Sequence, residues 1–241
     1  GVDGKILVAK APTLTMNNTL PKEIVEQALR EDHASASAEY LGEFRGDIES
    51  YISIDVVERV TREYPLQNTP NNNTRYYAFV DPSGGSADAF TMAIGHNDNG
   101  KVIVDAVYIH KAPFSPETVT QILADELKPY RINEVRGDAY AGQWPREQSQ
   151  KRKVHYKPIK HPKNELYRDL LPLLNSEQIE LPPIPQLINE LTSLERKTTR
   201  SGKDSIDHPS NGHDDVANAV AGIAFLCKQH QPVQKVKVTF F

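Results

Sequence analysis

Three consecutive strand-like segments in the middle of the chain limit most strongly what this sequence can fold into. "RYYAFVD", "DAFTMAIGH" and "KVIVDAVYIH" (residues 75–81, 88–96 and 101–110) are rich in β-branched and aromatic residues. The tetrapeptide "NDNG" between the last two is typical of a hairpin turn. We therefore expect an antiparallel meander of three strands.

Helices and further strands alternate after the meander. "SPETVTQILADELKPY" predicts an amphipathic helix, with Ser115 as its cap and Pro116 at its first position. Strands are predicted at "INEVRGD" and "VHYKPIK", and helices at "GQWPREQSQKRK", "KNELYRDLLPLL", "PQLINELTSLERK" and "VANAVAGIAFL". This order predicts a mixed α/β sheet, with parallel strands added to the meander and helices flanking it.

The first 70 residues are expected to form an appendage to a main domain at residues 71–241. "KILVAKAPT" predicts a short strand and "PKEIVEQALRED" a helix, followed by small amphipathic pieces that contain little apolar material. The asparagine-rich "QNTPNNNT" (residues 67–74) is the best linker candidate. The sequence contains no run of eighteen apolar residues, so no membrane span is predicted. It contains a single cysteine, Cys227, which excludes a disulfide framework.

Four aspartates stand at positions where ligands gather in α/β proteins. Asp81 and Asp138 each end a predicted strand, and Asp214 and Asp215 open the last helix. The alanines and the glycine of that helix allow it to pack closely on the sheet, which could bring its first turn over the strand ends. Taken singly, each aspartate has an ordinary alternative as a helix cap or a turn former.

Converging buried carboxylates repel one another unless a cation neutralises them. Mg²⁺ prefers carboxylate oxygens and retained waters, and two such ions can promote phosphodiester hydrolysis. The four aspartates therefore favour a site for two Mg²⁺ or Mn²⁺ ions. Asp88 and His213 are possible auxiliary residues, with an edge or turn role as the alternative. "DHPSNGHDD", which also contains His208, could alternatively hold zinc or manganese.

A local excess of basic residues suggests a surface for nucleic acid. The net charge of −4 argues against a globally basic binder, but Lys and Arg outnumber Asp and Glu between Trp144 and Asp204. "ERKTTRSGKD" leads directly into the acidic doublet, so we expect phosphate contacts from four of its residues: Arg196, Lys197, Arg200 and Lys203. A solvated basic face is the alternative.

Three acidic segments together resemble a known family. "FVDPSGGSADAFTMAIGH", "VRGDAYAGQW" and "RSGKDSIDHPSNGHDDVANAVAGI" are similar to the C-terminal nuclease domain of the phage terminase large subunit, which has a ribonuclease H-like fold. By this resemblance Asp81, Asp138 and Asp215 would bind metal, with Asp214 as an auxiliary ligand or a cap. Residues 1–70 would correspond to the end of the terminase ATPase region and its linker.

The resemblance also implies a biological role. The chain would be an endonuclease with little sequence specificity that cuts concatemeric viral DNA during packaging in the host cytoplasm. Its partners would be double-stranded DNA, the small terminase subunit and the portal protein, and no membrane is implied.

One departure from the family and two rival functions remain. None of the three Gly-Lys pairs completes the phosphate-binding pattern GxxxxGK[ST], so we expect no ATPase activity from this chain alone. The same fold would also suit a transposase, an integrase or a resolvase. A non-catalytic module that docks a motor onto a portal is the other alternative, since the tail "QPVQKVKVTFF" could add a strand to a partner.

Overall fold

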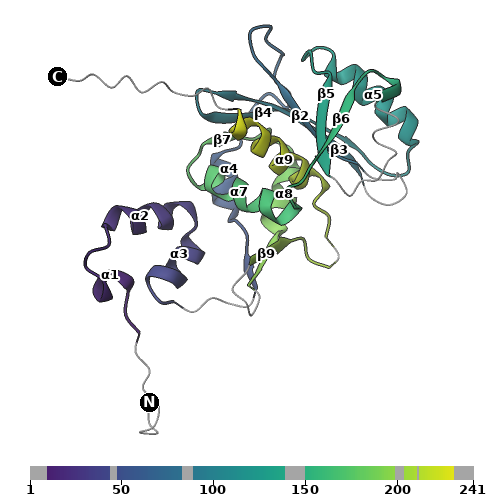
Figure 1. The fold of residues 1–241 in the computed structure, drawn as a ribbon. Helices are drawn as coiled ribbons and strands as arrows, with labels where there is room; N and C mark the ends of the chain where they lie inside the picture. Colours follow the sequence, from purple (N-terminus) through teal and green to yellow (C-terminus); the bar gives the residue numbers. More distant parts are fainter. Residues whose placement is uncertain are drawn as a thin grey trace, which may run out of the picture.

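A six-stranded mixed sheet forms the centre of the protein (Figure 1). The structure is a computed structural model that describes residues 10–43, 48–82, 89–138, 150–198, 204–210 and 212–230. The strand order across the sheet is β6-β5-β2-β3-β4-β7. This architecture confirms the predicted class, in which parallel strands extend an antiparallel meander.

The meander has the predicted boundaries to within two residues. It consists of β2 (Tyr77–Asp81), β3 (Phe90–Asp98) and β4 (Lys101–His110), each antiparallel to the next. Asn99 and Gly100 both have positive φ in the turn between β3 and β4, the conformation for which Asn-Gly is favoured. In the register of β2 and β3, Asp81 lies opposite Thr91.

Three parallel strands complete the sheet. β5 (Glu134–Asp138) lies beside β2, and β6 (His155–Ile159) lies beside β5 at the edge. β7 (Ile179–Glu180) pairs with β4 at the opposite edge. The sequence did not predict β7 because a two-residue strand is too short to show an alternating pattern. Most of the helix predicted at residues 142–153, and the whole tail at residues 231–241, lie outside the described residues.

Helices cover both faces of the sheet. One face carries α5 (Pro116–Leu127), which packs on the buried residues Val80, Met92 and Ile94. The other carries α9 (Asp215–Gln229), backed by α7 (Lys163–Asn175) and α8 (Pro185–Ser193). Ser115 is the N-cap residue of α5 as predicted, although its side chain makes no capping hydrogen bond.

Small residues let α9 lie against the sheet. Ala217, Ala221, Ala224 and Gly222 are all buried, and a methyl group added at Gly222 would overlap the ring of Phe79 on β2. Phe79 is itself fully buried, so its ring has no free space into which to move. The close contact of α9 with β2 therefore requires glycine at residue 222.

We expect Gly222→Ala to destabilise the fold by about 1–3 kcal/mol, the usual cost of overpacking a filled core. Helix propensity alone predicts the opposite, a gain of about 1 kcal/mol on replacing glycine by alanine. Urea unfolding would decide the sign, with Phe79→Leu added as the matched control that restores space. A more stable Gly222→Ala variant would contradict the packing described here.

A small second sheet lies beyond α8. Its order is β1-β8-β9, formed by β1 (Ile48–Ser50), β8 (Glu195–Thr198) and β9 (Asp204–Asp207). The helix predicted through residue 197 instead ends at Ser193, because Leu194 has an extended backbone and Glu195 starts β8. Residues 195–197 are all charged, so the sequence carries no alternation there, although Arg196 is buried and Lys197 is exposed in the structure.

The N-terminal helices lie at one side of the molecule, away from the sheet (Figure 1). They are α1 (Thr13–Met16), α2 (Lys22–Glu31), which matches the prediction, and α3 (His33–Tyr40). The amide of Asn175 on α7 donates to the Glu31 carbonyl, so the α2 end contacts the main domain. Most of the strand predicted at residues 5–13 lies outside the described residues, and α1 begins at Thr13.

Packing crosses the domain boundary predicted at residue 70. α4 (Ile54–Arg59) places Val57 in the same core as α7, α8 and α9. Within the proposed linker, the side chain of Asn68 donates to the carboxylate of buried Asp105 on β4 over 3.0 Å. Val57 and Asn68 thus contact the main domain. None of the described helices is long and apolar enough to cross a membrane.

Candidate active site

The parallel pairing of β2 and β5 brings two of the predicted acids side by side. Val80 pairs with Gly137, so the next residues, Asp81 and Asp138, lie at the carboxyl ends of two neighbouring parallel strands. A Cβ atom at Gly137 would lie 2.7 Å from the Val80 carbonyl oxygen, so glycine is needed for this close approach. The hydroxyl of Tyr156 donates to the backbone carbonyl of Asp138 over 2.7 Å and holds this strand end.

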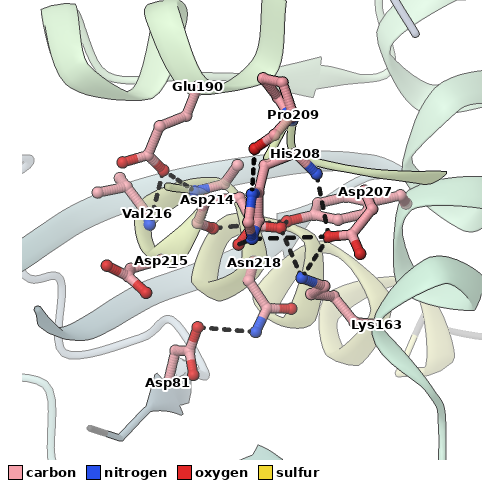
Figure 2. A network of polar contacts seen from close by, with 12 residues as sticks. Asp81, Lys163, Glu190, Asp207, His208, Pro209, Asp214, Asp215, Val216 and Asn218 are labelled. Atoms are coloured by element: carbon pink, nitrogen blue, oxygen red, sulfur yellow. Dashed lines mark hydrogen bonds and ion pairs between the residues drawn. The ribbon is translucent and has the colours of Figure 1, made fainter. Parts of the chain in front are cut away.

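The first turn of α9 contributes a third acid and an amide. Asp215 accepts a hydrogen bond at Oδ2 from the backbone of Ala89, at 3.2 Å. One turn later, Nδ2 of Asn218 donates to Oδ2 of Asp81 at 2.8 Å. Figure 2 shows Asp215 and Asp81 on the same side of the helix start, with Asn218 reaching down to Asp81.

Asp81 lies within electrostatic range of the three other predicted acids. Burial raises the pKa of Asp81 from its ordinary value of 3.8 to about 7, and the hydrogen bond from Asn218 opposes this increase. The negative charges of Asp215, Asp214 and Asp138 raise the pKa further, in that order. Folding thus brings acids that are distant in sequence within electrostatic range of Asp81.

The two members of the acidic doublet point in different directions. Asp214 is buried, and its Oδ2 accepts from the hydroxyl of Tyr167 at 2.8 Å and pairs with Nζ of Lys163 at 2.9 Å. Asp214 occupies the N-cap position of α9, yet its side chain makes no capping hydrogen bond. Asp214 therefore faces α7, whereas Asp215 faces Asp81 (Figure 2).

The capping role belongs to Glu190 on α8, which the sequence analysis did not identify. Oε2 of Glu190 accepts hydrogen bonds from the backbone amides of Val216 and Ala217, at 2.8 and 2.9 Å. A carboxylate at this position satisfies amides that the helix leaves unpaired and interacts favourably with the helix dipole. Burial is the largest influence on Glu190 and raises its pKa. Glu190 thereby fixes the turn that carries Asp215.

Glu190→Ala is expected to lower the free energy of unfolding by about 2 kcal/mol, because two buried amides lose their acceptor. Gln186→Ala is the matched control, since Gln186 donates only to the other oxygen of Glu190, at 2.8 Å. We expect this control to cost less than half as much in urea unfolding. Equal losses in the two variants would argue against a capping role.

A second group of possible metal donors lies beside the first. Asp207, His208 and Asp214 place one ligand atom each within 4.8 Å of one another. However, Nζ of Lys163 already lies 2.8 Å from Asp207 and 2.9 Å from Asp214, so an ammonium group supplies positive charge there. His208, at 4.0 Å from Asp214, is the histidine at this position, whereas His213 is exposed.

The predicted phosphate contacts have different surroundings. Arg196 is buried, with Nη1 at 2.6 Å from Asp32 and Nε at 2.9 Å from Asp204, so its guanidinium is held in ion pairs that join β8 to β9 and to α3. This placement gives Arg196 a structural role instead of a phosphate contact. Lys197 pairs with Glu195 at 3.0 Å and stays about half exposed. The other two predicted phosphate contacts, Arg200 and Lys203, lie outside the described residues. Asp88, a possible auxiliary residue of the acidic site, also lies outside them.

The mixed sheet, with α5 on one face and α9 on the other, defines a ribonuclease H-like α/β fold, and solved structures that share it are nuclease domains of phage large terminases. The large terminase nuclease from thermophilic phage G20c is 18% identical to this chain, with a TM-score of 0.57. The match covers 76% of this chain and 90% of the G20c chain. The large terminase nuclease domain from Thermus phage P74-26 is 20% identical, with a TM-score of 0.59. This match covers 73% of this chain and 94% of the P74-26 chain.

A longer large terminase chain also matches. That of bacteriophage HK97 is 13% identical, with a TM-score of 0.59, and the match covers 88% of this chain and 52% of that one. The chain thus spans about half the length of the HK97 protein. No protein-family model and no curated protein sequence matches the chain. At these identities, the comparisons establish the fold.

Proposed function

We propose that this chain is a metal-dependent DNA endonuclease that cuts concatemeric viral DNA during genome packaging. The observation that carries the proposal is the convergence of Asp81, Asp138 and Asp215 at one end of β2 and β5. A buried carboxylate whose pKa is raised towards 7 by burial and by its acidic neighbours is costly to keep ionised. A divalent cation bound between the three would remove this cost.

The donor set fits Mg²⁺ or Mn²⁺. Asp81, Asp138 and Asp215 offer only oxygen ligands, which hard cations prefer, and these three would hold the metal. When bound, two such ions activate a water molecule and stabilise the leaving oxygen in phosphodiester hydrolysis. A structure of the G20c large terminase nuclease has bound magnesium, and another has bound cobalt. These neighbours support a metal role for the acids of this chain.

The protein's own groups would position the substrate and the acids. Asn218 holds one oxygen of Asp81, and Glu190 holds the turn that carries Asp215. Lys163 and Tyr167 keep Asp214 turned away, so we assign Asp214 a structural role. Lys197, Arg200 and Lys203 would neutralise phosphates without reading bases, which suits cutting with little sequence specificity.

The proposed biological setting is the host cytoplasm. There the chain would act on double-stranded DNA as the nuclease part of a longer protein, together with a small terminase subunit and a portal protein. The match to about half of the HK97 large terminase supports this view of the chain as one part of a motor.

Digestion of supercoiled plasmid tests the proposal. Parallel reactions with Mg²⁺, Mn²⁺, Ca²⁺ and EDTA should give nicked and linear DNA with the first two ions and intact plasmid with EDTA. Strand-transfer products would favour a transposase or an integrase instead. Intact plasmid in every reaction, together with tight binding to a portal protein, would favour the docking module.

A further inference from the structure

A buried amide beside Asp81 has an oxygen without a hydrogen-bond partner among the described residues. Asn218 is 3% exposed, and its Nδ2 donates to Asp81. When a cation is bound, Asp81 is an ionised carboxylate that only accepts hydrogen bonds, so the NH₂ group of Asn218 faces Asp81 and Oδ1 faces elsewhere. Within the described part of the chain, Oδ1 of Asn218 has no hydrogen-bond partner.

A second buried oxygen, which has no hydrogen-bond partner among the residues that the structure describes, lies across the strand pair from Asp81. Thr91 is fully buried and stands opposite Asp81 in the β2–β3 register, where Cβ atoms are separated by roughly 5 Å. Its neighbours Phe90 and Met92 pack on the α5 side, so Thr91 faces the α9 side together with Asp81. Oγ1 of Thr91 also has no partner among the described residues.

Two such oxygens around one carboxylate require an explanation, because buried polar groups are nearly always hydrogen-bonded. Both atoms can accept a hydrogen bond. A water molecule coordinated to a cation directs its hydrogens outwards and therefore needs acceptors around it. Mg²⁺ in particular keeps several of its waters when it binds to carboxylates. The two oxygens are thus suited to the outer side of a hydrated metal ion.

We propose that Asn218 and Thr91 are positioning residues for the metal of this site, an inference that rests on the proposed function. The amide hydrogen of Asn218 holds Oδ2 of Asp81 and leaves Oδ1 of Asp81 for the cation. The amide oxygen of Asn218 and the hydroxyl oxygen of Thr91 accept hydrogen bonds from metal-bound water. An amide does this without adding a further negative charge next to Asp81.

Calorimetric titration of the whole chain with Mn²⁺ tests this inference without measuring cleavage. Thr91→Val and Asn218→Ala should each weaken Mn²⁺ binding about 10- to 100-fold, the range found when groups that orient metal ligands are removed. Thr120→Val is the matched control: Thr120 is buried on α5, and its hydroxyl donates to the Pro116 carbonyl at 2.7 Å. Its affinity for Mn²⁺ should equal that of the wild type.

Thermal unfolding of the metal-free variants separates positioning from a merely structural role. Valine has the shape of threonine and removes a hydroxyl that has no partner among the described residues, so Thr91→Val should unfold at or above the wild-type temperature. A structural role predicts a lower unfolding temperature with unchanged Mn²⁺ affinity, and this result would overturn the inference. Thr91→Val also keeps the test decisive if Asn218→Ala fails to fold.

Two reference proteins distinguish the failure of this inference from the failure of the proposed function. Wild type should bind Mn²⁺, and Asp215→Asn should lose most of that binding. If both hold while Thr91→Val and Asn218→Ala bind like wild type, the inference alone fails. If wild type shows no binding that depends on Asp215, the proposed function and the inference fail together.

Discussion

Asp81→Asn is expected to reduce metal-dependent DNA cleavage by at least about a thousandfold while DNA binding stays within a few-fold of wild type. Asp81 accepts a hydrogen bond from Asn218, and the negative charges of Asp138 and Asp215 raise its pKa. It therefore stands at the centre of the proposed metal site. A bound metal contributes several kcal/mol to such a reaction, and each 1.4 kcal/mol corresponds to about a factor of ten in rate. The phosphate contacts proposed for DNA are elsewhere in the chain.

Single-turnover nicking of plasmid DNA with Mg²⁺, beside a gel-shift assay in Ca²⁺, measures the two properties separately. The matched control is Asp98→Asn, which makes the same chemical change at an exposed residue where β3 ends. Asp98→Asn should cleave like wild type. An Asp81→Asn protein that cuts at the wild-type rate would exclude Asp81 from the reaction.

The second large effect concerns the stability of the metal-free protein. The pKa of Asp81 is about 7 in the folded protein, against an ordinary value of 3.8. The folded state therefore holds a proton that the unfolded state releases, so the contribution of Asp81 to stability falls as pH rises from about 4 to about 7. Since one pKa unit corresponds to about 1.4 kcal/mol, the loss from this group is of the order of 4 kcal/mol above pH 7.

Asp81→Asn should remove this loss, because the amide stays neutral at every pH. In EDTA at pH 8 the variant should be the more stable protein, and near pH 4 the two should converge. Urea unfolding between pH 4 and pH 8 measures the difference, which isolates Asp81 from other titrating groups. Addition of Mg²⁺ at pH 8 should stabilise the wild type and leave the variant nearly unchanged. Parallel stability curves for the two proteins in EDTA would contradict the burial of an ionisable Asp81.

Local sequence patterns were sufficient to predict five of the six strands of the central sheet, all except β7. The meander depends on alternating β-branched residues and on the Asn-Gly turn, and both are local signals. The convergence of Asp81 and Asp138 follows from the rule that parallel strands end at the same edge, so element order alone placed them together. Gly222 shows why the third acid joins them, since small residues bring α9 onto β2.

The groups that support the acids were not predictable in the same way. Glu190 caps α9 from another helix, and Lys163 pairs with Asp214 from a third, so neither contact leaves a trace in local sequence. Asn218 did leave one: it is a polar residue one turn after Asp215 in an otherwise apolar helix. Its position on the face of Asp215 could have marked it as a site residue.

The basic segment was the weakest part of the sequence interpretation. A charge count cannot separate a free guanidinium from one enclosed by carboxylates, and Arg196 is enclosed by Asp32 and Asp204. Asp32, at the junction of α2 and α3, is more than 160 residues away in sequence, so only the folded structure reveals the pair. The choice of Asp215 over Asp214 as a metal ligand came from the family resemblance, and the structure adds that Asp214 pairs with Lys163 on α7.

Anomalous diffraction from crystals soaked in Mn²⁺ tests the central claim most directly. We predict manganese peaks within coordination distance of the carboxylates of Asp81, Asp138 and Asp215. Manganese bound only beside Asp207 and His208, or no peak near Asp81 at a concentration that supports cleavage, would contradict the account.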